Sequence, residues 1–190
     1  MIRTHLRKIL STRYRNKIEA KGCIPAAVLI LLYEKDGIPY LLLTKRTQKV
    51  ADHKGQISFP GGVRDEKDES LEVTALREAA EEVGIDINKV EILGLLDDFL
   101  TVSTNYVITP VVGISSSPLQ FSINPEEVEE IIEIPLSFFQ DSLKTKSRFP
   151  NKDTIDDAYP SYRYGEHLIW GATAKILEQF LDIIQLIDFD

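Results

Sequence analysis

Residues 61–85 read GGVRDEKDESLEVTALREAAEEVGI. A helix is predicted over Leu71–Val83, because apolar residues recur there at the spacing of one helix face. These residues are Leu76, Ala79, Ala80 and Val83. Either Asp68 or Ser70 can cap the start of the helix, and Gly84 stands where a left-handed residue commonly ends one. The stretch therefore predicts two glycines, a polar loop and one amphipathic helix.

A patch of carboxylates occupies the other face of this helix. Glu78, Glu81 and Glu82 lie three and four positions apart, so their side chains are neighbours on the helix surface. Like charges at this spacing destabilise a helix unless something neutralises them. A hard divalent cation does so with the oxygen ligands that it prefers, and Mg²⁺ is usual where phosphates share the coordination shell. The alternative is an acidic face that is simply solvated.

The residues that precede the helix suit a ligand site. Residues 59–62 read FPGG, a turn whose glycines let the backbone approach a ligand closely. Arg77 adjoins the carboxylate patch and can pair with an acid of the preceding loop. A glycine turn, a loop and an acidic helix together would bring backbone oxygens beside the patch.

Strands are predicted on both sides of this region. They lie at Pro25–Tyr33, Pro39–Thr44, Val90–Phe99, Tyr106–Ile114 and Glu130–Ile134, with a weaker candidate at Tyr162–Trp170. A C-terminal helix is predicted over residues 172–187, where Ile176, Phe180, Ile183 and Ile187 form one stripe. Strands with flanking helices predict a layered α/β domain with a mixed sheet. The length of 190 residues suits a single domain over residues 1–190.

The composition excludes several classes of protein. The chain has 22 basic and 30 acidic residues, a net charge of −8, which argues against general affinity for nucleic acid. Its longest apolar runs are too short to cross a bilayer. The single cysteine, Cys23, excludes an internal disulfide and suits a reducing compartment. We therefore expect a cytoplasmic protein with neither a nucleic-acid nor a membrane partner.

The N-terminus is strongly basic. Residues 1–21 carry seven basic residues and one acidic residue. Such a composition can belong to a mitochondrial transit peptide. However, Ile2, Leu6, Ile9 and Leu10 have the spacing of a helix face that packs on a core. We therefore favour a basic surface helix over residues 1–21.

The helical stretch also carries a family resemblance. Residues 77–85 read REAAEEVGI and follow Glu69 after seven residues. This pattern resembles the Nudix box of hydrolases that act on nucleoside-diphosphate-linked substrates. Six residues, rather than five, separate Gly62 from Glu69, whereas the choice of Asp68 restores this spacing and lengthens the next one. The resemblance implies a Nudix-type α/β/α sandwich with a mixed β-sheet, and it is compatible with a homodimer.

The same resemblance implies a metal site. Glu78, Glu81 and Glu82 would bind Mg²⁺ or Mn²⁺, with help from the carbonyl of Gly62. Arg77 would orient Glu78 and the loop by pairing with Glu69.

The base that activates water is left open between two acids. It is either Glu82 itself or a loop acid, for which Glu127 is the second candidate. Glu127 is equally explained as a surface acid near a helix or turn start, because it follows Pro125 closely.

A second signature lies upstream. Residues 42–47 read LLTKRT and residues 55–62 read GQISFPGG, which resembles the motif of coenzyme A diphosphatases. Thr47 replaces the Ser or Ala of that motif, and Ala51 stands where a second Arg is expected. The resemblance implies hydrolysis of coenzyme A or acyl-coenzyme A to 3′,5′-ADP and a 4′-phosphopantetheine product. The candidates for substrate binding are Lys45, Arg46, Lys54 and His53.

Two other functions stay open. The Ala51 departure allows a broad-specificity Nudix pyrophosphatase that acts on dinucleotides, ADP-ribose or nucleotide sugars. The other function is an inactive Nudix-like binding module. The intact glutamate patch argues against it, because a site without catalytic activity does not need acids that repel one another.

Overall fold

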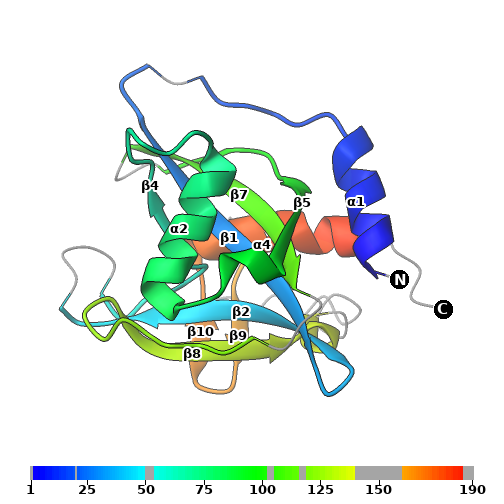
Figure 1. The fold of residues 1–190 in the computed structure, drawn as a ribbon, viewed down its shortest axis with the longest axis vertical. Helices are drawn as coiled ribbons and strands as arrows, with labels where there is room; N and C mark the ends of the chain where they lie inside the picture. Colours follow the sequence, from blue (N-terminus) through cyan, green and yellow to red (C-terminus); the bar gives the residue numbers. More distant parts are fainter. Residues whose placement is uncertain are drawn as a thin grey trace.

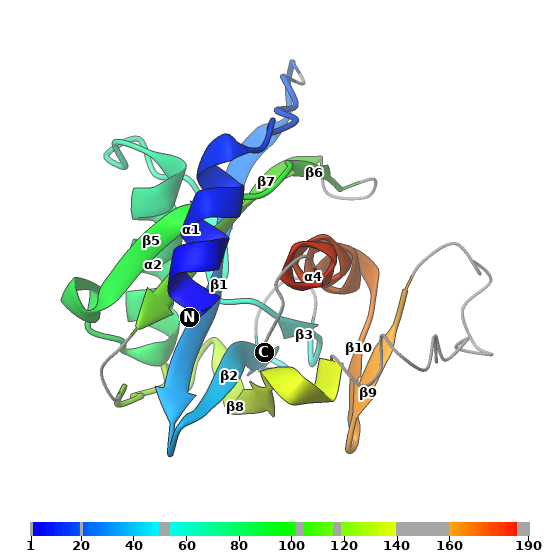
Figure 2. The same cartoon turned by 90° about the vertical axis from the view of Figure 1, so that its right-hand side faces the viewer.

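The computed structural model describes residues 2–19, 21–49, 54–101, 105–115, 119–139 and 160–185. A mixed β-sheet separates two helices, α2 (Leu71–Val83) on one face and α4 (Gly171–Ile184) on the other. Figure 2 shows these three layers, with α2 to the left of the sheet and α4 to the right. The predicted α/β/α sandwich is confirmed. None of the helices in the described part of the chain is long and apolar enough to cross a membrane.

Strand β1 (Ile24–Lys35) forms the centre of the sheet. From Ile24 to Tyr33 it pairs in parallel with β7 (Tyr106–Ser115). Its other edge is shared, because β4 (Gly61–Val63) pairs with its first half and β2 (Ile38–Arg46) with its last residues. β4 and β2 therefore pair with different parts of the same edge of β1. Helix α2 packs against β1 and β4 (Figure 1).

The outer strands extend the sheet at both sides. β2 pairs with β3 (Ile57–Ser58) and, along most of its length, with β8 (Val128–Pro135). On the far side, β7 pairs with β5 (Val90–Leu95) and β6 (Phe99–Leu100). The ladders therefore bring the end of β2, the start of β3 and the loop before β8 together.

The core lies on both faces of the sheet. Side chains of a strand alternate between faces, so Leu29 and Leu31 of β1 pack toward α2, while Ile30 and Leu32 pack toward α4. A strand that is buried on both faces needs an uninterrupted apolar run, which explains the sequence of β1. The helix side chains that meet these strands include Ala75, Ala79 and Val83 of α2 and Ile176, Leu177 and Phe180 of α4.

Helix α1 (Ile2–Thr12) lies along β5, and its Leu6 and Leu10 are buried in the core (Figure 2). The predicted helix over residues 1–21 is therefore too long. Residues 14–19 have no regular secondary structure, and Arg13 and Arg15 pair with acids that follow β5.

Those acids are Asp97 and Asp98. Arg13 Nη2 donates to Asp97 Oδ1 at 2.7 Å, and Arg15 Nη2 donates to Asp98 Oδ1 at 2.5 Å. The Ile18 backbone N–H donates to the second oxygen of Asp98 at 2.9 Å. Residues 96–98 belong to neither strand, so the strand predicted over Val90–Phe99 is divided into β5 and β6.

Two C-terminal predictions also need correction. The weak strand at Tyr162–Trp170 is a hairpin of β9 (Tyr162–Tyr164) and β10 (His167–Ile169), which turns at Gly165 with φ of 58°. The helix predicted over residues 172–187 is α4, which ends at Ile184, and residues 186–190 lie outside the described residues.

Candidate metal and diphosphate site

Local capping sets both ends of α2. Ser70 is the N-cap, and its Oγ accepts from the Val73 backbone N–H at 3.3 Å. Gly84 has a φ of 67°, and its N–H donates to Ala80 O at 3.0 Å. Of the two predicted caps, Ser70 is therefore the one observed, and the helix has the predicted bounds.

The loop that precedes β8 runs along the end of α2. Ser122 N–H donates to Val83 O and Asn124 N–H donates to Glu82 O, both at 2.9 Å. A Cβ on Gly84 would lie 2.7 Å from the Ser122 carbonyl oxygen, so only glycine allows this approach. These contacts hold the segment that carries Glu127 against the acidic helix.

The glycines of β4 bring its backbone onto the carboxylate patch. A Cβ on Gly61, whose φ is 156°, would lie 2.3 Å from the Ala27 carbonyl oxygen in β1. A Cβ on Gly62 would lie 2.5 Å from the Glu78 carboxylate. The missing Gly62 side chain therefore lets the Glu78 carboxylate lie directly against the backbone of β4, and the missing Gly61 side chain lets β4 lie close to β1.

Arg77 ties the loop, β4 and α2 together. Its Nε and Nη2 donate to the two carboxylate oxygens of Asp68 at 3.1 and 2.9 Å, and Nη2 also donates to Val63 O. Its Nη1 lies 2.8 Å from Glu78 Oε1 and 3.0 Å from Glu81 Oε2. One guanidinium thus holds two glutamates of the patch and the acid of the loop.

The prediction that Arg77 pairs with Glu69 is therefore wrong, because the partner is Asp68. Asp68 is 4% exposed and also accepts from Thr74 Oγ1 at 2.9 Å, whereas Glu69 is exposed. A turn in which Asp68 N–H donates to Asp65 O directs Asp68 inward. The Arg77 guanidinium holds the pKa of the Asp68 carboxyl well below its usual range.

Glu82 is the most buried acid of the patch, with a side chain 3% exposed. Its Oε2 has no hydrogen-bond partner in the part of the chain that the structure describes. Arg46 Nη1 lies 3.6 Å from its Oε1. Burial raises the pKa of Glu82 to about 8; the Arg46 cation opposes this shift, and the charges of Glu127 and Glu78 add to it.

Glu127 joins the same cluster from the loop before β8. Asn124 Nδ2 donates to Glu127 Oε1 at 3.1 Å, and Thr47 N–H donates to the Glu127 carbonyl oxygen at 2.9 Å. Burial raises the pKa of Glu78; its ion pair with Arg77 opposes this shift, and the charges of Glu81 and Glu127 add to it. The tertiary fold therefore brings Glu127 into electrostatic contact with Glu78 and Glu82.

The chemistry of this cluster fits a hard divalent cation. Among the described residues, no three acidic, histidine or cysteine side chains are already gathered as a metal-binding group, and Arg77 is paired with both Glu78 and Glu81. However, Glu82 keeps a buried oxygen without a partner, and the acids around it repel one another. Carboxylate and carbonyl oxygens are the ligands that Mg²⁺ and similar ions prefer.

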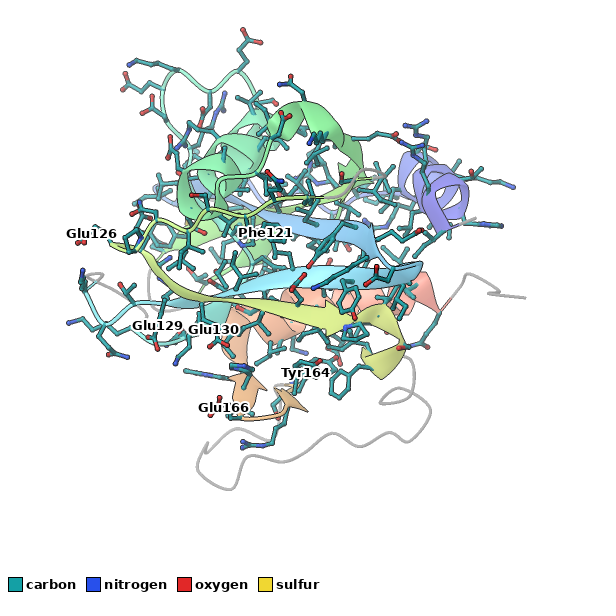
Figure 3. The ribbon with its side chains drawn as sticks, turned by 60° about the horizontal axis from the view of Figure 1, so that its bottom comes forward. Phe121, Glu126, Glu129, Glu130, Tyr164 and Glu166 are labelled. Carbon is teal, nitrogen blue, oxygen red and sulfur yellow. The ribbon has the colours of Figure 1, made fainter. Side chains whose placement is uncertain are left out.

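The predicted substrate-binding residues separate into two groups. Arg46 lies at the acidic cluster, whereas Lys45 Nζ pairs with Glu129 Oε1 at 2.7 Å on the outer surface of β8. Figure 3 shows Glu129 beside Glu130 on this surface, near the hairpin residue Glu166. Lys54 is exposed. The prediction for His53, and the Ala51 departure, lie outside the described residues.

Two residues of the site, Asp68 and Asn124, are not among the site residues that the sequence predicts. The sequence offers Asp68 only as a cap or as an alternative to Glu69, and it gives Asn124 no role. The feature that could have predicted Asp68 is its separation from Gly62 by five residues, as in the Nudix box. Asn124 and Glu127 are only three residues apart, so a turn that begins at Asn124 is the local feature that could have predicted their hydrogen bond.

The sandwich fold, the glycine strand and the acidic helix define a hydrolase site for diphosphates. The fold is similar to that of a solved Nudix hydrolase, RenU from M. smegmatis, with a TM-score of 0.59, 16% sequence identity and coverage of 90% of this chain and 99% of that one. The NUDIX domain family model matches residues 24–156, and the chain belongs to the Nudix hydrolase family. Members of this family hydrolyse nucleoside-diphosphate-linked substrates and generally use divalent metal ions.

Two relatives extend the comparison. Nudix hydrolase NudL of Photorhabdus laumondii is 42% identical over 164 residues, which cover 85% of each chain. Nudix hydrolase 15, mitochondrial, of Arabidopsis thaliana is 39% identical over 159 residues, which cover 80% of this chain and 55% of that protein. The chain thus spans about half the length of the plant relative and most of the bacterial one.

Proposed function

We propose that this chain is a diphosphatase of coenzyme A or acyl-coenzyme A that releases 3′,5′-ADP and a 4′-phosphopantetheine product. The observation that carries the proposal is the contact of Arg46 with Glu82. Arg46 belongs to the signature that resembles coenzyme A diphosphatases, and Glu82 belongs to the Nudix helix. Two separate signatures that meet at one cluster support a substrate whose diphosphate lies between them.

We assign the metal site to Glu78, Glu81, Glu82 and the carbonyl of Gly62, with Mg²⁺ or Mn²⁺ as the ion. The ion would neutralise the charge of the diphosphate and lower the pKa of a bound water. Glu78 and Gly62 are already adjacent, whereas Glu81 has to exchange its ion pair with Arg77 for the metal. Arg77 keeps Glu78 in position through its bonds to Asp68.

Glu127 is the base that we favour for activating water. Glu82 is almost fully buried, so it is suited to ligation, whereas Glu127 is partly exposed and can reach a water molecule. The Asn124 amide donates to one carboxylate oxygen of Glu127 and leaves the other free of that bond. A base must lie within hydrogen-bond reach of the proton that it takes, and the neighbouring metal site would supply that water.

A second candidate is a broad-specificity Nudix pyrophosphatase that acts on dinucleotides, ADP-ribose or nucleotide sugars. The observation in its favour is Ala51, which stands where the coenzyme A signature has an arginine. A missing cation weakens recognition of a phosphate-rich ligand.

A substrate comparison separates the two candidates. The purified protein is assayed with Mg²⁺ and with Mn²⁺ on coenzyme A, dephospho-coenzyme A, ADP-ribose and a dinucleotide, and the products are identified by mass. A hydrogen bond between charged groups contributes about 1.5–3 kcal/mol, so the 3′-phosphate should give coenzyme A at least about a tenfold advantage in kcat/KM over dephospho-coenzyme A.

The cations outside the acidic cluster test the origin of that advantage. Lys45→Ala or Lys54→Ala should reduce it, whereas Lys49→Ala, which removes a surface partner of Glu126, should leave it unchanged. Equal efficiency on the two coenzymes, or clearly faster cleavage of ADP-ribose, would move the assignment to the broad-specificity enzyme.

A further inference from the structure

Arg46 occupies an irregular position in the sheet. It is the last residue of β2, and the register of β2 with β8 shifts between Lys45 and Arg46. Its backbone is held by Gln56 O, which accepts from Arg46 N–H at 3.0 Å. Such irregularities re-aim side chains and are common beside active sites. Two consecutive cations point to different acids, as neighbours in a strand point to opposite faces: Lys45 lies at the surface acid Glu129 and Arg46 at the buried acid Glu82.

The contact between Arg46 and Glu82 is incomplete. The 3.6 Å separation of Nη1 and Oε1 is longer than a hydrogen bond. Arg46 Nε and Glu82 Oε2 are both buried and have no hydrogen-bond partner among the described residues. Native proteins rarely bury such atoms without a partner, so this pair of atoms needs an explanation.

Arg77 provides the comparison within the same site. Its guanidinium makes two short bonds to Asp68 and further contacts to Glu78, Glu81 and Val63 O. Arg77 is therefore a fixed part of the loop, whereas Arg46 can leave Glu82 without breaking a formed hydrogen bond. The Arg46 side chain is 25% exposed, so one side of it already faces solvent.

We propose that Arg46 is the exchangeable counter-cation of Glu82: it neutralises this buried carboxylate before a divalent metal binds, and its guanidinium then binds a diphosphate oxygen of the substrate. This inference rests on the proposed metal site and deepens it. A cation this close to Glu82 acts at the diphosphate rather than at the 3′-phosphate of coenzyme A. The role suits arginine, whose planar fork matches both carboxylate and phosphate.

Metal binding without substrate tests the exchange. Mg²⁺ affinity is measured by calorimetry at pH 9, where protons compete less for the glutamates. Arg46→Gln removes a cation that competes with the metal, so it should bind Mg²⁺ at least about fivefold more tightly than the wild type, which is about 1 kcal/mol. Lys49→Gln removes an exposed cation that is paired with Glu126, and its affinity should stay within about twofold of the wild-type value.

Substrate kinetics test the second half of the proposal. With saturating metal, Arg46→Gln should lower kcat/KM by at least about tenfold on the best substrate, and Arg46→Lys should recover part of the loss because it restores the charge. The Arg46 Nε signal, followed by NMR, should shift on addition of Mg²⁺.

The outcomes are distinguishable. Unchanged or weaker Mg²⁺ binding by a folded Arg46→Gln protein would refute the proposal that Arg46 exchanges with the metal. An Arg46 Nε signal that does not shift on addition of Mg²⁺ would also refute it. Tighter metal binding together with cleavage of ADP-ribose but not coenzyme A would support the exchange and refute the proposed substrate. Thermal melting of each variant establishes that it is folded.

Discussion

Replacing Asp68 with Asn should destabilise the domain substantially, because Asp68 is the buried anchor of the loop that leads into α2. Its carboxylate accepts from Arg77 Nε, Arg77 Nη2, Thr74 Oγ1 and the Asp65 backbone N–H. An amide of the same shape keeps only one acceptor oxygen and removes the charge. Two charge-assisted bonds to Arg77 are weakened, and since the Arg77 side chain is 29% exposed we use the lower value of about 1.5 kcal/mol for each.

The expected loss is therefore about 3 kcal/mol in the free energy of unfolding, or about 6–12 °C in Tm for a domain of this size. Urea unfolding at pH 7 measures it. The matched control is Glu69→Gln, which changes the neighbouring acid in the same loop. Because Glu69 is exposed, its replacement should change stability by less than about 0.5 kcal/mol.

The pH dependence gives a further check on Asp68. Its pKa is lowered in the folded protein, so its contribution is present above the ordinary pKa of an aspartate, about 3.9, and is lost as the pH falls below that value. The wild type and Asp68→Asn should therefore converge in stability as the pH falls from about 4 toward 2. A Glu69→Gln protein that is less stable than Asp68→Asn would refute the assignment of the loop anchor.

Two other perturbations test the acidic helix and the N-terminal segment. Glu82→Gln should lower turnover about a thousandfold, equivalent to about 4 kcal/mol of transition-state stabilisation, and near-normal turnover would disprove its place in the metal site. The raised pKa of Glu82, about 8, means that the metal-free wild type loses stability as the pH rises from about 5 to 8. Urea unfolding should show that Glu82→Gln lacks this loss. Leu6→Ala should lower the free energy of unfolding by about 2–5 kcal/mol, because Leu6 is fully buried, and a change below about 0.5 kcal/mol, as expected for exposed Ile24→Ala, would contradict a packed α1.

The sequence by itself determined the features that depend on residues close together in the chain. The bounds of α2 followed from its apolar spacing and from Gly84, and the carboxylate patch followed from the three- and four-residue spacing of its glutamates, since neighbours on a helix are set by helix geometry alone. The apolar run at Pro25–Tyr33 likewise indicated a strand, which is observed as β1.

The tertiary structure decided which distant residues share the site. The choice between Asp68 and Glu69 depended on a turn of the loop that directs one acid inward, and spacing alone left both open. Arg46 and Glu82 are far apart in sequence and meet only because β2, β4 and α2 pack together around β1. Glu127 joins them because Asn124 binds the end of α2 and Thr47 binds the loop. Contacts of this kind depend on where packed elements place a side chain, and no local periodicity encodes that position.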